Sequence, residues 1–116
     1  SNPAPVFQFY VNSSWDTHTC GGGFRWGRIP PSIPSYKNAI TNELFLALSS
    51  SLYEATGKAA YLEWALREWS WLEGSGMIND EGLINDGLTA TCKNNNRTTW
   101  TYNQGVVLGG LASLYR

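Results

Sequence analysis

Charged side chains are scarce in this sequence, and the two signs nearly balance. They make up 15% of the 116 residues, with eight Lys or Arg against nine Asp or Glu. The formal net charge of -1 leaves no excess of cations to neutralise a phosphate backbone, so nucleic acid and anionic membranes are not expected partners. The sequence also lacks any apolar run near the roughly 18 residues that a membrane span requires.

Cysteine and histidine are rarer still. Cys20 and Cys92 are too few and too far apart for a zinc site, which takes about four ligands in short paired spacings. The only histidine, His18, comes without the Gly-x-Ser-x-Gly elbow of many serine hydrolases, and we expect it at the surface. The glycines 21–23 are not followed by the lysine of a phosphate-binding loop. We therefore expect no metal, no cofactor and no nucleotide site.

What the chain does contain is 42% hydrophobic residues, with six Trp and six Tyr, which fits one globular domain at most and argues against intrinsic disorder. Glycosylation sequons begin at Asn12 and Asn96, and with an even cysteine count they favour a secreted protein, although chance sequons remain the alternative. We expect a Cys20–Cys92 disulfide rather than two free buried thiols. Closing so long a loop would stabilise the fold by about 4 kcal/mol in the chain-entropy model.

Hydrophobic residues recur at helical spacing in several segments. The pattern predicts helices over 6–12, 36–56, 58–72 and 101–116. Because little more than Gly57 separates the second from the third, these two are expected to be antiparallel, as an αα-hairpin. The sequence therefore predicts an all-α fold.

Finer features of these helices can also be predicted. Ser35 is the expected cap of the helix over 36–56, and Gly57 is its expected end. The expected buried stripe of that helix is Ile40, Leu44, Ala47, Leu48, Ser51, Leu52 and Ala55. In the next helix the stripe is Tyr61, Ala65, Trp69 and Leu72, and the tryptophans expected to pack between helices are Trp64, Trp69 and Trp71. Because interior glycine costs about 1 kcal/mol, close packing of the last helix is expected at Gly105, Gly109 and Gly110.

Three segments lack helical periodicity. Glycine and proline make 15–35 a loop. The alternation of Asn, Asp and Gly with apolar residues over 78–88 predicts tight turns and a small β-hairpin, and its acidic residues lack the spacing of a calcium-binding EF-hand loop. Residues 89–99 are expected to form a polar loop.

Amide, carboxylate and indole side chains gather in these loops and at the starts of the helices. This combination is typical of carbohydrate recognition, because sugar hydroxyls pair with planar polar groups and the apolar face of a sugar stacks on an aromatic ring. The set comprises Trp15, Asp16, Arg25, Trp26, Lys37, Asn38, Asn42, Glu43, Asn85, Asp86, Trp100, Tyr102, Asn103 and Gln104. Plainer roles stay open: Asn38 and Asn42 bonding to neighbouring loops, Asp86 as a turn residue, and Glu43 in a salt bridge with Lys37 or Arg25.

Four blocks of the sequence resemble glycoside hydrolase family 76, the α-1,6-mannanases, especially the fungal members. The blocks, in the family's order, are Trp15-Asp16 with Cys20-Gly21-Gly22-Gly23 and Trp26; Tyr36-Lys37-Asn38-Ala39 with Asn42-Glu43-Leu44-Phe45; Gly76-Met77-Ile78 through Ile84-Asn85-Asp86-Gly87-Leu88; and Trp100-Thr101-Tyr102-Asn103-Gln104-Gly105. The resemblance implies an (α/α)6 toroid and endo-acting, retaining hydrolysis of α-1,6-mannosidic bonds without a metal.

Retention requires two carboxylates about 5 Å apart. In the family they are consecutive aspartates upstream of the Cys-Gly-Gly-Gly block, and this sequence contains no Asp-Asp pair. We therefore expect the catalytic pair upstream of Ser1, no catalytic residue in this chain, and residues 1–116 to be the middle portion of a toroid domain, inactive alone. Because four helices of a toroid would expose apolar flanks, the remainder of the parent chain is an expected partner.

The resemblance also implies which residues line the substrate cleft. Asp86, with Asn85, is expected to bind a sugar hydroxyl near the scissile bond. The other candidates are Asn38, Asn42, Tyr102, Asn103 and Gln104, with Trp26 and Trp100 as stacking platforms. The expected ligand is α-mannan or a mannooligosaccharide, and the expected location is secreted or at the cell wall. A non-catalytic mannan-binding module and a purely structural helical module are the alternative functions.

Overall fold

The computed structural model describes residues 4–25 and 36–115. This part of the chain contains four helices: α1 (Ala4–Ser14), α2 (Ala39–Thr56), α3 (Ala59–Gly74) and α4 (Thr101–Leu114). No helix among these residues is long and apolar enough to cross a lipid bilayer. The all-α fold expected from the sequence is confirmed.

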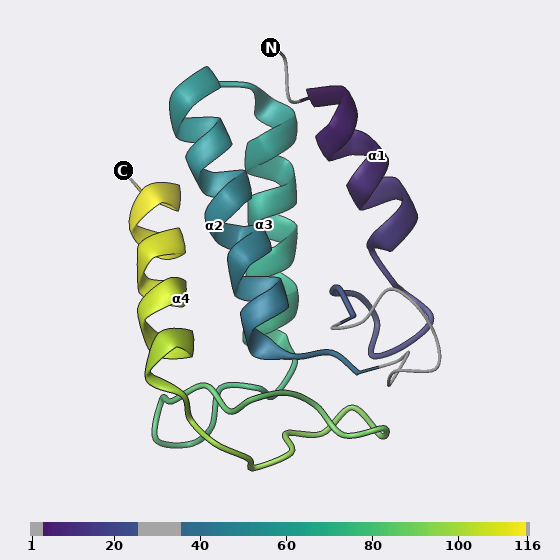
Figure 1. The fold of residues 1–116 in the computed structure, drawn as a ribbon, viewed down its shortest axis with the longest axis vertical. Helices are drawn as coiled ribbons and strands as arrows, with labels where there is room; N and C mark the ends of the chain where they lie inside the picture. The colour runs from purple at the N-terminus through teal and green to yellow at the C-terminus, as the bar shows by residue number, and fades with distance from the viewer. Residues whose placement is uncertain (1–3, 26–35, 116) are drawn as a thin grey trace.

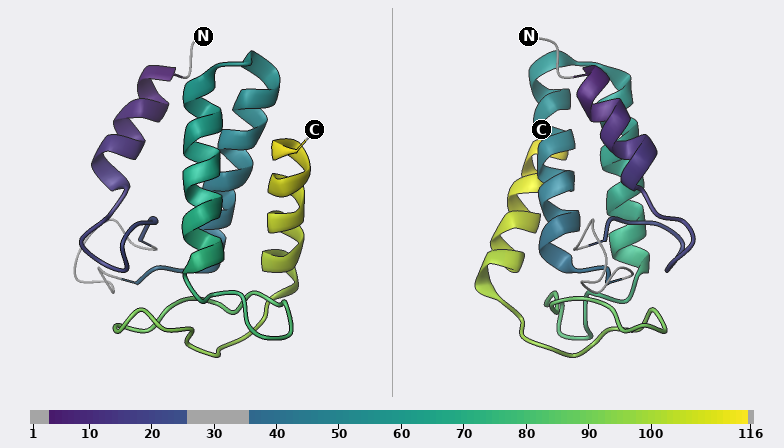
Figure 2. Two further views of the ribbon diagram at one scale, coloured as in Figure 1. Left: turned by 180° about the vertical axis from the view of Figure 1, so that it is seen from behind. Right: turned by 45° about the vertical axis from the view of Figure 1, so that its right-hand side comes forward.

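The helices form a row, with the long connecting loops at one end and the short turn between α2 and α3 at the other. α2 and α3 are the expected antiparallel hairpin, and Gly57 ends α2 in a left-handed conformation (φ 70°). α4 lies beside α2 and α1 beside the hairpin's other flank (Figure 1, Figure 2). Because α2 and α4 both start at the loop end, their positive dipole ends point the same way.

Two hydrophobic clusters hold the row together. Between α2, α3, α4 and the loops lies an aliphatic core built from Leu46, Ala65, Leu72, Met77, Ile84, Leu88, Val107 and their neighbours. On the other side of the hairpin lies an aromatic core formed by Phe7, Val11, Phe24, Phe45 and Tyr61. Phe24 stands over Phe45 with 4.4 Å between the ring centroids, and therefore anchors the 15–25 loop to α2.

The start of α2 differs from the prediction. The helix begins at Ala39, with Asn38 as its N-cap residue, rather than at Tyr36. Tyr36, Lys37 and Asn38 instead precede the helix, and isolated β-bridges pair Lys37 with Arg25 and Asn38 with Gly87. Pairing with two distant loops thus outweighs the helical periodicity at this end. The predicted cap, Ser35, lies outside the described residues.

The buried face of α2 also differs from the predicted stripe. Leu44 and Leu48 are 54% and 50% exposed. The helix instead buries Ala39, Asn42, Glu43, Phe45, Leu46, Ser49 and Ser50. The prediction from hydrophobic periodicity is wrong here because several of the buried residues are polar. The exposed leucines, with Val6 and Phe9 on α1 and Leu108 on α4, make up the apolar flanks that were expected.

The remaining predictions divide between the elements. In α4, Gly110 lies against Leu46, and a Cβ there would come within 3.1 Å of that side chain. The expectation of close packing is wrong for Gly105 and Gly109, which have open space beside them among the described residues. The predicted hairpin in 78–88 is reduced to a single bridge between Ile78 and Ile84.

Candidate functional site

The chemistry-bearing loops meet at the end of the row where α2 and α4 begin, and we call this region the loop end (Figure 1). A disulfide joins Cys20 to Cys92, with 5.3 Å between their Cα atoms, as the sequence led us to expect. It ties the glycine-rich 15–25 loop to the polar 89–99 loop, 72 residues further along the chain. Both cysteines adopt positive φ angles, so the cross-link fixes two tightly turned segments.

The side chain of Lys37 binds the backbone of the glycine-rich 15–25 loop. Its fully buried ammonium donates hydrogen bonds to the backbone carbonyls of Asp16, Thr19 and Gly22. The carboxylate of Asp16 lies 3.7 Å from the same nitrogen and 3.9 Å from Arg25 Nε. Burial lowers the pKa of Lys37, and the negative charge of Asp16 opposes that shift. Lys37 therefore has a structural role, and the charge of its ammonium is balanced by the Asp16 carboxylate of the glycine-rich loop.

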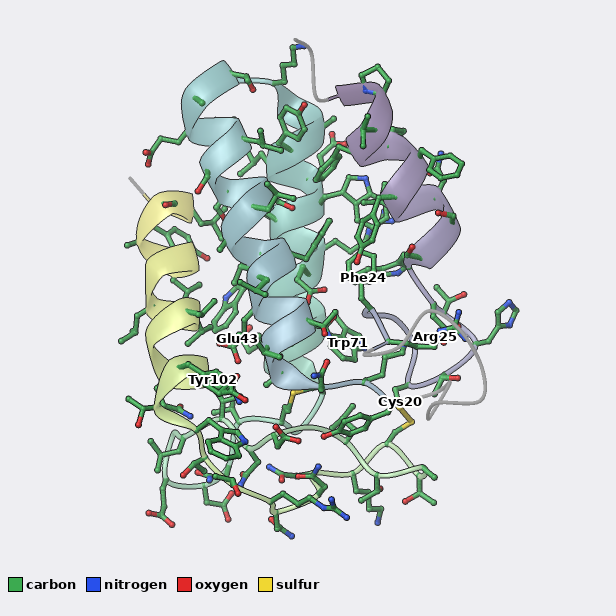
Figure 3. The ribbon with its side chains drawn as sticks, in the orientation of Figure 1. Cys20, Phe24, Arg25, Glu43, Trp71 and Tyr102 are labelled. Carbon is green, nitrogen blue, oxygen red and sulfur yellow. A yellow bond between two sulfur atoms is a disulfide. The ribbon has the colours of Figure 1, made fainter. Side chains whose placement is uncertain are left out.

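The glycines of this loop allow an indole ring to approach its backbone. A Cβ on Gly23 would lie 2.6 Å from the ring of Trp71, and Gly23 has a φ of +82°. Trp71 Nε1 donates a 2.8 Å hydrogen bond to the carbonyl of Cys20 (Figure 3). The prediction that Trp64, Trp69 and Trp71 pack inside the fold is confirmed, since all three pack against the two cores.

Asp86 is held at the N-terminal end of α2. Its carbonyl accepts the N–H of Ala39 at 2.8 Å, and its Oδ2 accepts a 2.5 Å hydrogen bond from the Tyr36 hydroxyl. The Asn95 amide in turn donates to that hydroxyl at 3.3 Å. Burial, and then the neighbouring Asp86 carboxylate, raise the pKa of Tyr36 to about 12, so the phenol remains a donor.

A cavity of about 380 Å³ opens beside this carboxylate. Its lining consists of Tyr36, Asp86, Leu88, Thr89, Asn95 and Arg97, and we call it the Asp86 cavity. Arg97 also lines a second, polar hollow of about 620 Å³ between the turn at 79–85 and residues 96–99. The Asp86 cavity thus combines a carboxylate, an amide, a guanidinium and hydroxyl groups, a set that suits a polyhydroxylated ligand.

Several predicted cleft residues serve the loops themselves. Asn42 is buried and exchanges hydrogen bonds with the backbone N–H and carbonyl of Phe24. Asn85 accepts hydrogen bonds from Asn79 and Asn94 and donates to the carbonyl of Arg97. For Asn42, the plainer alternative of bonding to a neighbouring loop therefore describes the observed contacts.

Other candidates are placed differently. Gln104 pairs with both backbone groups of Ile84 and so fastens α4 to the turn region. Trp100 and Tyr102 are half exposed and stacked, with 5.7 Å between their ring centroids. Asn38 and Asn103 are buried, and Trp26 lies outside the described residues.

Glu43 does not form the salt bridge that was considered for it. Lys37 and Arg25 pair with Asp16, whereas both carboxyl oxygens of Glu43 are buried without a hydrogen-bond partner among the described residues. Figure 3 labels Glu43 between α2 and α4. Burial raises the pKa of Glu43 to about 8, and the nearby backbone N–H of Val107 opposes part of the shift. The side chain is therefore a protonated acid at neutral pH.

Two further sequence predictions concern modification and metals. The side chains of both sequon residues, Asn12 at the end of α1 and Asn96 beside Arg97, are exposed, and their glycosylation stays a prediction. His18 is at the surface, as predicted. In residues 4–25 and 36–115, no three His, Cys, Asp or Glu side chains gather in a group suited to a metal ion.

Of the residues that line the Asp86 cavity, sequence reasoning named only Asp86 as a candidate, and Tyr36, Asn95 and Arg97 are among those that it missed. Tyr36 belongs to one of the blocks that carry the family resemblance, which was the one available signal. Asn95 and Arg97 lie in a polar stretch without periodicity. The disulfide, the bridge between Leu88 and Asn94, and the hydrogen bond from the Asn95 N–H to the Gly87 carbonyl bring that stretch to Asp86.

Solved structures share this arrangement of helices. Dfg5 from Chaetomium thermophilum, solved in complex with glucosamine, superposes with a TM-score of 0.80 at 33% identity over 95% of this chain and 28% of that one. An inactive variant of the α-1,6-mannanase GH76A from Salegentibacter, with two neighbouring aspartates changed to asparagine and α-1,6-mannotriose bound, gives 0.73 at 25% identity over 97% of this chain and 33% of that one. The helices therefore correspond to part of an α/α toroid.

The sequence comparisons identify the family. The model of glycosyl hydrolase family 76 matches residues 4–116, and the chain belongs to that family. It is 36% identical to mannan endo-1,6-alpha-mannosidase DCW1 of Candida albicans over 90% of this chain, and 38% identical to DFG5 of Saccharomyces cerevisiae over 89%. The chain spans 24% of the length of each of these two relatives.

Proposed function

We propose that this chain is part of the catalytic domain of an endo-α-1,6-mannosidase and supplies one wall of its substrate cleft. Family membership supports this assignment, as do the names of the curated relatives, which are mannan endo-1,6-alpha-mannosidases. Residues 1–116 would be the middle portion of the toroid, with the remainder of the parent chain as their partner. The apolar flanks on α1, α2 and α4 are the surfaces that neighbouring helices would cover.

The chain's own contribution is binding. The Asp86 carboxylate accepts hydrogen bonds from a mannosyl hydroxyl in the Asp86 cavity, while Asn95 and Arg97 offer donors beside it. The stacked rings of Trp100 and Tyr102 form an exposed aromatic surface at the start of α4, on which the apolar face of a sugar can lie.

Bond cleavage falls to residues outside this chain. A retaining mechanism needs a nucleophile and an acid/base carboxyl about 5 Å apart, and the sequence contains no Asp-Asp pair. The Salegentibacter relative is inactive when two neighbouring aspartates are replaced, and this supports a paired-aspartate mechanism.

The observation that carries the proposal is the carboxylate of Asp86 on the Asp86 cavity, beside an amide, a guanidinium and hydroxyl groups. The test is Asp86→Asn in the full-length protein, with release of reducing ends from α-1,6-mannan as the readout. Loss of a charge-assisted hydrogen bond of about 1.5–3 kcal/mol should lower kcat/KM about 10- to 150-fold. Glu63→Gln, a matched neutralisation of an exposed carboxylate on α3, should leave kcat/KM unchanged. Equal rates for Asp86→Asn and the parent protein would refute the assignment.

Mass spectrometry tests the proposal that residues 1–116 are part of a longer chain. The denatured and reduced protein from its natural source should weigh several times 12.9 kDa, the mass of this chain. A mass of 12.9 kDa, with mannotriose binding and no hydrolysis, would instead establish a non-catalytic binding module.

We also propose that the protein is secreted or attached to the cell wall. The disulfide and the exposed sequon residues Asn12 and Asn96 support an oxidising compartment with N-glycosylation. Removal of N-glycans should lower the apparent mass, and the Asn12→Gln and Asn96→Gln variants should each abolish part of that shift. No shift in any of these proteins would exclude the glycan proposal.

A further inference from the structure

Three segments far apart in the sequence meet at one side of the Asp86 carboxylate. Tyr36 lies just before α2, Asp86 lies in the turn region, and Asn95 lies in the loop tied down by the disulfide. Their side chains form a continuous line of hydrogen bonds, in which Asn95 Nδ2 donates to the Tyr36 hydroxyl and that hydroxyl donates to Asp86 Oδ2. Residue separations of 50 and 59 show that the line depends on the complete loop end.

The direction of this line is fixed by the next contact. Asn95 Oδ1 accepts the backbone N–H of Arg97 at 2.9 Å, and the backbone N–H of Asn95 donates to the carbonyl of Gly87 at 3.0 Å. Because the amide oxygen is engaged by an N–H, the amide nitrogen must be the atom that faces Tyr36. The Tyr36 hydroxyl therefore receives one hydrogen bond from Asn95 and directs its own proton to Asp86.

Gly87 makes room for the tyrosine. A Cβ at this position would stand 2.6 Å from both Cε1 and the hydroxyl oxygen of Tyr36, and 2.7 Å from the carbonyl oxygen of Lys37. No real Cβ tolerates such contacts, so the ring can lie against the backbone beside Asp86 only because residue 87 is glycine. The ring thus lies where its hydroxyl reaches Oδ2 of Asp86.

We propose that Tyr36, supported by Asn95, is a positioning residue that locks the Asp86 carboxylate in the orientation required to bind a mannosyl hydroxyl. The inference rests on the proposed function of Asp86. With Oδ2 held by the phenol, Oδ1 is the oxygen assigned to the sugar, and the side chain cannot rotate away when the cavity is empty. Preorganised acceptors of this kind bind more tightly because ligand binding need not order them. The high pKa of Tyr36 keeps the donor protonated across the range in which such an enzyme works.

A double-mutant cycle in the full-length protein tests whether Tyr36 acts through Asp86, with kcat/KM on α-1,6-mannan as the readout. Tyr36→Phe keeps the ring but removes the hydroxyl, and it should lower kcat/KM about tenfold, mostly through KM. In the Asp86→Asn background the same change should have almost no further effect, because a residue that acts through Asp86 has nothing left to position. Tyr53→Phe, which alters a tyrosine packed beside the aromatic core, should leave kcat/KM unchanged.

The cycle separates failure of this inference from failure of the proposed function. If Asp86→Asn is itself without effect, the binding role of Asp86 is wrong. If Asp86→Asn is impaired but Tyr36→Phe is fully active, or if the two losses multiply, only the positioning role is overturned.

A spectroscopic measurement tests the contact between Tyr36 and Asp86 without using the Tyr36→Phe variant. Ultraviolet titration of tyrosine ionisation should show one group that ionises at lower pH in Asp86→Asn than in the parent protein, because the Asp86 charge and hydrogen bond contribute to the raised pKa of Tyr36. Identical titration curves would show that Tyr36 does not bind Asp86, and the positioning role would be refuted.

Discussion

Replacing Glu43 with Gln should stabilise the protein at neutral pH while changing little at pH 4.5. Glu43 is fully buried, and burial raises its pKa from 4.5 to about 8. A carboxyl group with a higher pKa in the folded state binds more protons when folded. Its contribution to stability is therefore complete below pH 4.5 and is lost as the pH rises toward 8.

The magnitude follows from the interval between the pH and the unfolded pKa. At pH 7 the unfolded chain carries an ionised Glu43, and folding must protonate it over about 2.5 pH units at about 1.4 kcal/mol each. The penalty is about 3 kcal/mol in the parent protein. Glutamine has nearly the same shape and is neutral in both states, so the variant avoids this penalty.

Urea unfolding followed by tryptophan fluorescence at pH 4.5 and pH 7 measures the difference. The free energy of unfolding of Glu43→Gln relative to the parent protein should rise by up to about 3 kcal/mol between the two conditions. Glu63→Gln, at an exposed position of α3, should show no such change. If Glu43→Gln differs from the parent protein by the same amount at both pH values, Glu43 ionises normally and the reasoning is refuted.

Three further predictions concern the loop end. Lys37→Met leaves three buried carbonyls without their donor, so it should destabilise the protein by about 3 kcal/mol or more and speed hydrogen exchange in the glycine-rich loop. Unchanged exchange there would contradict the assigned role. Gly23→Ala adds a Cβ that would overlap the ring of Trp71, at a residue with a positive φ. It should lower the free energy of unfolding by about 2–4 kcal/mol and alter the near-ultraviolet circular dichroism. An unaltered spectrum would show that the Trp71 ring does not lie against Gly23. Replacing Cys20 and Cys92 together with Ser should lower stability by about 4 kcal/mol, and a melting temperature equal to the parent's would show that the loops hold without the bond.

The sequence predicted the helices well because helical periodicity is local. All four predicted helices exist, and Gly57 ends α2 where it was expected to. The predicted buried face of α2 was wrong because Asn42, Glu43 and Ser49 are buried there. A search for hydrophobic periodicity does not count polar residues. Asn42 is buried for a tertiary reason, because it binds the backbone of Phe24, 18 residues away.

The candidate site could be predicted only in part. Asp86 lines a cavity, and its role as a ligand stays a proposal. Asn85 and Gln104 carry amides that could equally bind a sugar, but they donate hydrogen bonds to backbone carbonyls of the neighbouring loops. Amides that bind a sugar and amides that bind a peptide group look alike in sequence, and only the three-dimensional partners distinguish them.

The buried ammonium of Lys37 does for its loop what a bound cation does in many others. Three main-chain oxygens converge on one positive charge, and the Asp16 carboxylate balances it. A dissolved ion would leave whenever its concentration fell, but this charge is tethered to the chain and its local concentration never changes. The shape of the loop, and with it the position of the disulfide, is therefore set once on folding and is indifferent to chelators and to the ionic composition of the surroundings.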